Sequence, residues 1–257
     1  MEVNKIIQGD CLEVMPNMPD KSIDMILCDL PYGTTACKWD TIIPFEPLWK
    51  QYKRIIKDNG AIVLTASQPF TSALVMSNIK MFRYCWEWDK VVGGNFINAK
   101  IMPLKIYEDI LVFYKKQPIY NPQMVLRNIN NRRISGKSKL KKNNINNINQ
   151  LENIKSNKYM YPTTKIEINR LNNELNSKHV LHPTQKPVAL FEYLIKTYTN
   201  KGDIVLDNCA GSGTTGVACK NLGRNYILIE KEKKYIEIIN KRIKAIPELL
   251  FDSQEII

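Results

Sequence analysis

The sequence predicts an α/β fold, in which helices cover both faces of a doubly wound (Rossmann-like), mainly parallel sheet. Seven short apolar runs recur along the 257 residues, polar turn residues follow them, and helix-like stretches separate several of them. Strands that alternate with helices favour parallel pairing in a sheet that is buried on both faces. Because a chain of this length buries a full core, we expect one domain with an insertion.

Four of the predicted strands are followed by an acidic residue, namely Asp10, Asp29, Asp207 or Glu230. The carboxyl ends of strands carry the sites of α/β folds, so these acids are candidate site residues. In chain order, the predicted strands are Val3–Ile7, Ile23–Cys28, Ala61–Thr65, Arg83–Trp88, Ile110–Tyr114, Ile204–Leu206 and Tyr226–Ile229. The clearest predicted helices are Pro47–Lys57, Leu190–Thr199 and Thr215–Leu222.

The order of these elements predicts a permuted sheet. Only a helix-like tail follows Glu230, which is too little to complete a nucleotide-binding sheet, so the remaining strands must come from the N-terminal half. We therefore expect residues 1–116 and 181–257 to form two halves of one seven-stranded sheet, with a small basic insert at 117–180. In this topology Asp10, after the first strand, lies beside Glu230. Asp10 then either accepts from an adenine amino group or caps the helix that begins at Cys11.

The net charge of +12 favours a polyanionic partner, with nucleic acid ahead of an anionic membrane surface. A compositional bias toward Lys and Asn is the alternative explanation. The six cysteines and two histidines form no metal-ligand pattern and no C-x-x-C, so we expect no metal and a reduced, cytoplasmic setting. No apolar run is long enough to cross a bilayer, so we expect no membrane contact.

The predicted insert is basic, poor in acids, and contains the low-complexity run from Asn143 to Asn149. We expect it to be partly disordered and to be the target-recognition region that contacts DNA, with a linker that reads no sequence as the alternative. The candidate DNA-contact residues are Arg127, Arg132, Arg133, Lys137, Lys139, Lys141 and Lys142.

A glycine-rich loop between a predicted strand and helix is a candidate cofactor site. The glycines at 211, 213 and 216 have the spacing of a dinucleotide fingerprint, and Glu230 follows at the end of the next strand. Asp207 at the mouth of the turn would repel a pyrophosphate but attract the ammonium and sulfonium of S-adenosylmethionine. The predicted loop residues are Asp207, Ala210, Gly211, Ser212, Gly213 and Thr214, with Glu230 on the ribose.

The early segment Asp29-Leu30-Pro31-Tyr32 is a candidate grip for a planar amine. The Asp29 carboxylate and the Leu30 carbonyl can each accept one N–H of an exocyclic amino group, and both bonds strengthen as positive charge builds on that nitrogen. Pro31 fixes the turn and Tyr32 offers a face on which a flipped base can stack. Together the two loops suggest methyl transfer to the amino group of a nucleic-acid base.

These motifs, in this order, resemble the amino-group DNA methyltransferases in which a D-P-P-Y-type motif precedes the cofactor motif. The resemblance spans most of the chain. It is carried by Gly9 to Glu13, Asp29 to Thr35, Trp39-Asp40, Trp88 to Lys90, Glu108 to Phe113, Tyr120 to Pro122, His182 to Pro187 and Asp207 to Thr215.

The resemblance implies a methyltransferase sheet, S-adenosylmethionine as methyl donor and double-stranded DNA as substrate. It implies that Asp10 and Cys11 lie at the adenine of the cofactor, and that Thr184 and Lys186 lie near its methionine end. A helix start at Pro187 is the alternative interpretation of this last segment. Asp rather than Ser at the first motif position favours adenine N6 over cytosine N4 as the target. Leu30 replaces the usual first proline, but only its carbonyl is required.

Other functions stay open at this point. A cytosine-N4 DNA methyltransferase would use the same machinery, and a non-catalytic DNA-binding protein could keep the scaffold. Methylation of a glutamine amide or an RNA amine fits less well, because those families carry Asn first in the motif and place the cofactor loop first. The sequence does not show the recognition site, whether the chain forms a homodimer, or whether a restriction enzyme accompanies it.

Overall fold

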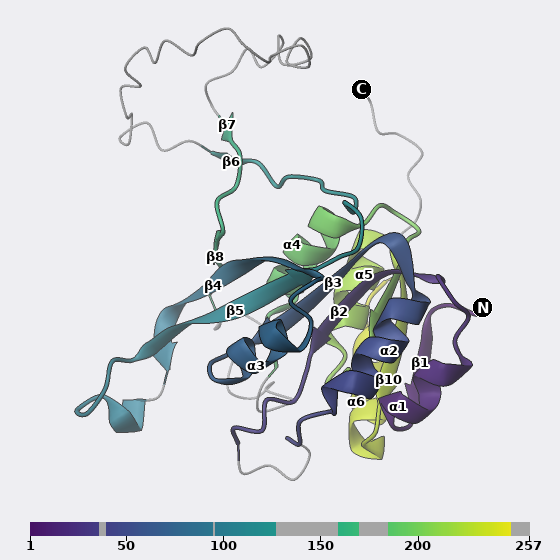
Figure 1. Ribbon diagram of the computed structural model, residues 1–257, viewed down its shortest axis with the longest axis horizontal. Coiled ribbons are helices and arrows are strands. Elements are labelled where there is room, and N and C mark those ends of the chain that lie inside the picture. The colour runs from purple at the N-terminus through teal and green to yellow at the C-terminus, as the bar shows by residue number, and fades with distance from the viewer. Residues whose placement is uncertain (36–39, 95, 127–158, 170–184, 248–257) are drawn as a thin grey trace, which may run out of the picture. The chain divides into compact units, whose positions relative to one another are not determined.

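The computed structural model describes residues 1–35, 40–94, 96–126, 159–169 and 185–247 (Figure 1). In this part of the chain the main sheet comprises β1 (Lys5–Gln8), β2 (Ile23–Asp29), β3 (Ile56–Ala66), β4 (Phe82–Gly94), β5 (Lys105–Phe113), β8 (Lys165–Glu167), β9 (Ile204–Asp207) and β10 (Asn225–Glu230). The helices are α1 (Cys11–Val14), α2 (Phe45–Ile55), α3 (Phe70–Ser77), α4 (Val188–Tyr198), α5 (Thr214–Leu222) and α6 (Lys233–Lys244), with short 3-10 turns η1 (Met15–Asn17) and η2 (Phe96–Asn98).

The strand order β1-β10-β9-β2-β3-β5-β4-β8 confirms the permuted sheet. The two C-terminal strands β9 and β10 lie between β1 and β2, so both ends of the chain contribute to one nucleotide-binding half. In the main sheet of the described residues, the neighbouring pairs from β1 to β3 and the pair β4–β8 are parallel, and only β5 runs against its neighbours. The expectation of a mainly parallel, doubly wound α/β sheet is therefore confirmed.

The sheet has eight strands in the described residues rather than the seven predicted. The additional strand, β8, is three residues long and pairs with the edge of β4, from Glu87 to Asp89. Its sequence, Lys-Ile-Glu, contains no apolar run, so no pattern indicated it. The predicted insert, 117–180, begins before this strand and extends past it, and its boundaries stay a prediction.

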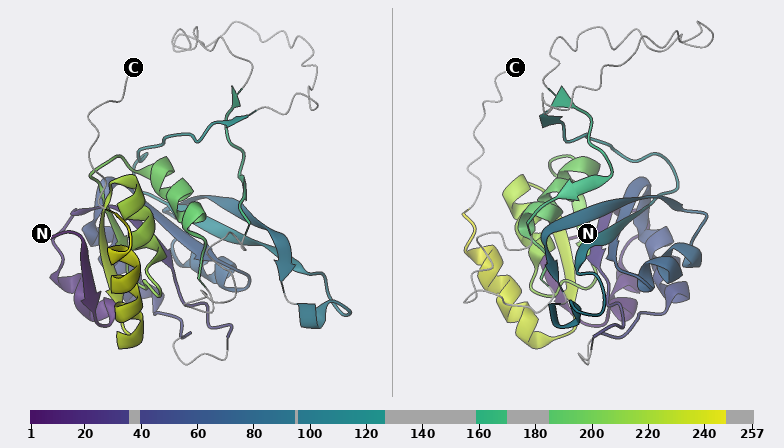
Figure 2. Two further views of the ribbon diagram at one scale, coloured as in Figure 1. Left: turned by 180° about the vertical axis from the view of Figure 1, so that it is seen from behind. Right: turned by 90° about the vertical axis from the view of Figure 1, so that its left-hand side faces the viewer.

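Helices cover both faces of the sheet, as predicted (Figure 1). Side chains along β2 alternate between two hydrophobic clusters, because successive residues of a strand point to opposite faces. Met25 and Leu27 pack in the cluster that contains residues of α4, α5 and α6, whereas Ile26 and Cys28 pack with α1, α2 and α3. The view from behind shows α4 and α6 on the face of the sheet toward which Met25 and Leu27 point (Figure 2).

The predicted helices are present with shifted ends. The helix predicted over Pro47–Lys57 is α2, which ends at Ile55 because the next two residues already belong to β3. The helix predicted over Leu190–Thr199 is α4, which begins at Val188 with Pro187 as its N-cap. The helix start that was the alternative interpretation of this segment is therefore present. Helix α3 was not predicted, since its short sequence lies among turn residues and shows little amphipathic pattern.

A separate unit, Pro122–Thr163, contains the two short antiparallel strands β6 (Val125–Leu126) and β7 (Tyr159–Met160). The candidate DNA-contact residues from Arg127 to Lys142 lie outside the described residues. Among the described residues no helix is both long enough and apolar enough to span a membrane.

Candidate active site

The ends of neighbouring parallel strands bring the candidate acids into one row. Gln8 of β1 lies beside Glu230 of β10, and Leu228 of β10 lies beside Asp207 of β9. On β2, Asp29 lies beside Thr65 of β3. This row lines a cavity of about 820 Å³. The carboxyl edge of the sheet is thus the site, as α/β folds place it.

Most of the predicted site residues line this single cavity. They are Asp10, Cys11, Asp29, Leu30, Pro31, Tyr32, Lys186, Asp207, Ala210, Gly211, Ser212, Thr214 and Glu230. Gly213 lies directly between two of these residues at the start of α5. Thr184 lies outside the described residues. The Asp29–Tyr32 motif and the glycine-rich loop, which are far apart in the sequence, therefore line one cavity. Their positions in the sequence alone do not show that they lie together.

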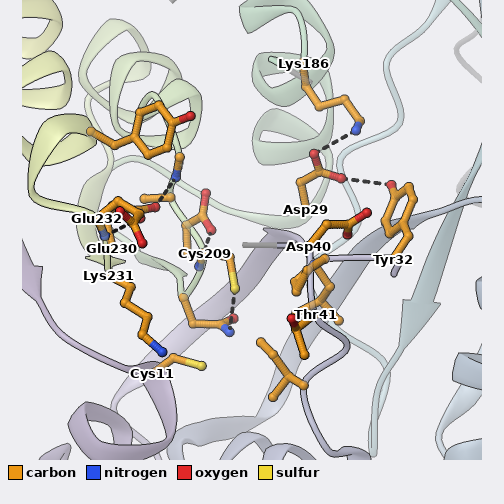
Figure 3. A pocket seen from close by; sticks show the side chains of 18 of the residues that line it. Cys11, Asp29, Tyr32, Asp40, Thr41, Lys186, Cys209, Glu230, Lys231 and Glu232 are labelled. Atoms are coloured by element: carbon orange, nitrogen blue, oxygen red, sulfur yellow. Dashed lines mark hydrogen bonds and ion pairs between the residues drawn. The ribbon is translucent and has the colours of Figure 1, made fainter. Parts of the chain in front are cut away.

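Asp29 and Tyr32 form one wall of the cavity (Figure 3). The Tyr32 hydroxyl lies 2.8 Å from Oδ1 of Asp29 and donates to it, and Thr65 bonds to the same oxygen. The Tyr32 ring stacks on Phe70 with 5.2 Å between ring centroids. Burial, followed by the charge of Asp29, raises the pKa of Tyr32 well above its usual value. Tyr32 therefore stays neutral and orients the carboxylate.

Lys186 holds the other oxygen of Asp29. Its Nζ lies 2.7 Å from Oδ2 of Asp29, and the ammonium also lies over the Tyr32 ring, 5.5 Å from the centroid (Figure 3). Burial alone would lower the pKa of Lys186, but the carboxylates of Asp29 and Glu108 outweigh burial and raise it. The sequence did not indicate this contact. The predicted contact of Lys186 with the carboxylate of methionine stays a prediction.

A second buried ion pair continues from Lys186. Oε2 of Glu108 lies 3.4 Å from Nζ of Lys186, and Oε1 accepts from Nζ of Lys90 at 2.9 Å. Burial would raise the pKa of Glu108, but Lys186 and Lys90 lower it to about 2. Asp29, Lys186, Glu108 and Lys90 therefore form a chain of alternating charges, and the first three of them line the cavity.

The glycine-rich loop is tied to the end of β10. Glu230 accepts from the backbone N–H of Gly211 at 2.7 Å and from that of Glu232 at 2.8 Å. Gly213 adopts a φ of +82°, and a Cβ at this position would lie 2.9 Å from side-chain carbons of Ile239. Glycine is therefore required at 213 both by the backbone conformation and by the close approach of α6.

The two acids at this end of the cavity, Asp207 and Glu230, are buried. Burial raises the pKa of Asp207 to about 6, although hydrogen bonds from Thr215 and from the Cys209 backbone favour its ionised form. Burial also raises the pKa of Glu230. Carboxylates held in a low-dielectric pocket interact strongly with a cationic or hydroxyl-bearing ligand.

Asp10 lies where the topology predicted, since the N–H of the preceding residue, Gly9, donates to the Glu230 carbonyl at 3.0 Å. Its side chain accepts from the N–H of Leu12 and caps α1, so the capping role is confirmed. The second carboxylate oxygen lies 3.4 Å from Nζ of Lys231. Asp10 and Cys11 both line the cavity, so capping does not remove the carboxylate from it.

Several cavity residues were given no role at the sequence level. Asp40 accepts from the backbone N–H groups of Gly33, Thr34 and Thr35 and thereby fixes the loop after Tyr32. These hydrogen bonds lower the pKa of Asp40 despite its burial. Glu108 belongs to a segment that carried the family resemblance, but its role depends on pairing across strands. An acidic residue at the start of an apolar strand was the only signal.

A row of strand-end acids, a glycine-rich turn and a stacking ring in one cavity define an α/β enzyme that binds a nucleoside-containing ligand beside a planar group. A family model described as DNA methylase matches residues 23–241, and the chain belongs to this family. The predicted family is therefore confirmed.

Individual relatives agree with this assignment. The type II methyltransferase M.HpaI of Haemophilus parainfluenzae is 28% identical over 253 residues, which cover 94% of this chain and 74% of the relative. The DNA adenine methyltransferase YhdJ of Escherichia coli K12 is 29% identical over 258 residues, covering 94% and 83%. The crystal structure of the M1.HpyAVI–SAM complex superposes with a TM-score of 0.63 at 27% identity, covering 94% of this chain and 99% of that chain.

Proposed function

We propose that this DNA methylase transfers a methyl group from S-adenosylmethionine to N6 of an adenine that is flipped out of double-stranded DNA. The observation that carries the proposal is the shared cavity: Asp29 and Tyr32 line it together with the glycine-rich loop and Glu230. A base amine and a nucleoside cofactor held in one cavity can react without a covalent enzyme intermediate. A DNA substrate is consistent with action in the cytoplasm of a bacterial host.

The cavity residues fit S-adenosylmethionine by charge. The carboxylates of Asp207 and Glu230 line the cavity and suit an ammonium and the ribose hydroxyls, respectively. Asp10 and Cys11 lie on the Glu230 side, where they would hold the adenine ring. The proposed cofactor-binding set is completed by Ala210, Ser212, Thr214, Thr184 and Lys186. When bound, S-adenosylmethionine supplies an electrophilic methyl group on a sulfonium.

Asp29 and Leu30 would supply the acceptors for the target amine. The lone pair of an exocyclic amine is delocalised into the ring, so the nitrogen must be drawn toward tetrahedral geometry before it becomes nucleophilic. The Asp29 carboxylate and the Leu30 carbonyl would each accept one N–H, and both bonds strengthen as the nitrogen becomes positive. The nitrogen loses one proton after the N–C bond forms, so Asp29 need not be a strong base.

The Tyr32 ring would stack on the flipped base. Extrusion from the duplex costs a few kcal/mol, and stacking on an aromatic ring returns about 1–3 kcal/mol. Phe70 supports the ring from the protein side, and the Tyr32 hydroxyl keeps the Asp29 carboxylate in place. Pro31 removes a backbone donor from this turn and fixes its course.

Two features favour adenine N6 over cytosine N4 as the target. The first motif position is Asp29 rather than a serine, and the relative YhdJ is named as a DNA adenine methyltransferase.

The basic residues Arg127 to Lys142 are proposed to bind the DNA backbone. This part of the proposal depends on their charge, because they lie outside the described residues.

Sequencing of DNA from cells that express the protein, with detection of modified bases, tests this proposal. We expect N6-methyladenine at one short recurring sequence, and no such mark in cells that express the Asp29→Ala variant. N4-methylcytosine at a recurring site would replace the proposed target with the alternative one. Unmodified DNA, despite soluble and folded protein, would contradict the proposal.

A further inference from the structure

Glu108 carries a buried oxygen that is incompletely bonded. Among the described residues, Oε2 of Glu108 is buried and accepts no hydrogen bond, while Nζ of Lys186 lies 3.4 Å away. The same Nζ lies 2.7 Å from Oδ2 of Asp29. Leaving a buried carboxylate oxygen without a hydrogen bond is unfavourable, so Glu108 is poised to bind the ammonium more closely.

Lys90 keeps Glu108 fixed and ionised. Nζ of Lys90 lies 2.9 Å from Oε1 of Glu108, and the Lys90 side chain is itself buried, with 6% of its surface exposed. The ammonium groups of Lys90, on β4, and Lys186, just before α4, therefore both attract the carboxylate of Glu108 on β5. Because Glu108 is anchored by Lys90 at one oxygen, only its second oxygen is free to attract Lys186.

Lys186 in its present position competes with the target amine. Its ammonium bonds to Oδ2 of Asp29, while Tyr32 and Thr65 already bond to Oδ1. It also lies over the Tyr32 ring, on which the base would stack. A positive charge at this place opposes the positive charge that develops on the amino nitrogen, and the repulsion is strong in a buried site.

We propose that Glu108 is a positioning residue for methyl transfer, which draws the Lys186 ammonium away from Asp29 when the target amino group donates to Asp29. This inference rests on the function proposed above. The two distances, 2.7 Å and 3.4 Å, show that a small side-chain displacement exchanges the nearer carboxylate. Two carboxylates and two ammonium groups balance in charge, so the exchange requires no proton transfer.

Glu108→Gln tests the proposal, because glutamine keeps the shape of the side chain and removes its charge. We expect the single-turnover rate of methyl transfer at saturating S-adenosylmethionine to fall about tenfold or more. The affinity for S-adenosylmethionine by calorimetry and the affinity for DNA should stay within about threefold. Glu87→Gln is the matched control, since Glu87 is an exposed glutamate on the neighbouring strand β4. This variant should transfer methyl groups at the wild-type rate.

Lys186→Met separates positioning from a structural role. If Glu108 acts by attracting Lys186, the charge of Glu108 should have little effect on the rate of methyl transfer once the Lys186 ammonium has been removed. Adding Glu108→Gln to Lys186→Met should then change the rate less than about twofold, and Lys186→Met alone should react faster than Glu108→Gln alone. All of these rates are single-turnover rates at saturating S-adenosylmethionine, because Lys186 also belongs to the proposed cofactor-binding set. Thermal unfolding of each variant shows whether it is folded at the assay temperature.

The outcomes distinguish this inference from the proposed function. A wild-type protein that transfers no methyl group to DNA would remove the proposed function and the inference with it. An active wild-type protein with an equally active Glu108→Gln variant would overturn the inference alone. So would a Lys186→Met variant that is slower than Glu108→Gln, or a Glu108→Gln effect of equal size in both backgrounds.

Discussion

Nζ of Lys186 lies 2.7 Å from Oδ2 of Asp29, although 157 residues separate the two in the sequence. The contact joins the proposed target-base loop to the segment that leads into α4. In addition, the backbone carbonyl of Lys186 lies 3.3 Å from the Thr214 hydroxyl in the glycine-rich loop. One residue therefore connects the two halves of the site, by its side chain on one side and by its backbone on the other.

Replacement of Asp29 by alanine should abolish methyl transfer while cofactor binding persists. The carboxylate is the proposed acceptor for the target amine, so its loss removes transition-state stabilisation and should lower the rate at least about a hundredfold. Transfer of tritiated methyl groups and calorimetry with S-adenosylmethionine measure the two properties separately.

Asp58→Asn is a suitable control, because Asp58 forms surface ion pairs with Lys21 and Lys116 near the amino end of β3. Exposed pairs of this kind contribute little to stability. Strong residual transfer by Asp29→Ala would show that another group accepts the amine.

Tyr32 should tolerate loss of its hydroxyl better than loss of its ring. Tyr32→Phe keeps the stacking surface on Phe70 but loses the bond to Asp29, so we expect a rate within about tenfold of wild type. Tyr32→Ala loses stacking worth about 1–3 kcal/mol and should reduce base extrusion. The fluorescence of 2-aminopurine at the target position reports extrusion, and an equal signal from both variants would exclude a stacking role.

Asp207→Asn should stabilise the protein and weaken cofactor binding. The pKa of Asp207 rises from 3.8 to about 6 on folding, because burial disfavours its charge. The folded state thus binds this proton more tightly than the unfolded state. The resulting cost to stability is complete above about pH 6 and vanishes below the unfolded pKa of 3.8. At pH 8 the variant should gain about 1–3 kcal/mol of unfolding free energy, and the gain should disappear toward pH 4.

The same charge is proposed to attract the ammonium of S-adenosylmethionine. Its removal should weaken binding about tenfold or more at pH 8, as expected for a charged hydrogen-bond partner. Wild-type affinity should fall as the pH drops below about 6, where Asp207 becomes protonated. Calorimetry across this pH range measures both effects. A variant that binds as tightly as the wild-type protein would place the ammonium elsewhere.

Neutralising basic residues of the insert should reduce the salt dependence of DNA binding. Replacement of Arg132, Arg133, Lys141 and Lys142 by glutamine should lower the slope of log K against log salt by about 0.9 for each phosphate that the variant leaves unneutralised. A variant with glutamine at Lys50, Lys53, Lys241 and Lys244, four exposed lysines of α2 and α6, loses the same number of charges and controls for net charge. An unchanged slope in the insert variant would place the DNA on another surface.

The strands and the two loops could be predicted because each is marked locally. Apolar runs that end at Asp29, Asp207 and Glu230 identify strand ends, and the permuted order follows from what is missing after Glu230. The charge network could not be predicted in this way. Glu108 and Lys90 come together because β4 pairs antiparallel with β5. Lys186 reaches Glu108 because the segment before α4 lies next to β5. No local sequence pattern marks either of these contacts.

The most direct test of the central claim is mass spectrometry of nucleosides after reaction with S-adenosylmethionine that carries a deuterated methyl group. Unmodified duplex DNA incubated with the wild-type protein should yield deuterated N6-methyladenine, and DNA incubated with Asp29→Ala should yield none. Deuterated label in another nucleoside would contradict adenine N6 as the target. Equal label from both proteins would contradict the roles proposed for Asp29 and its pocket.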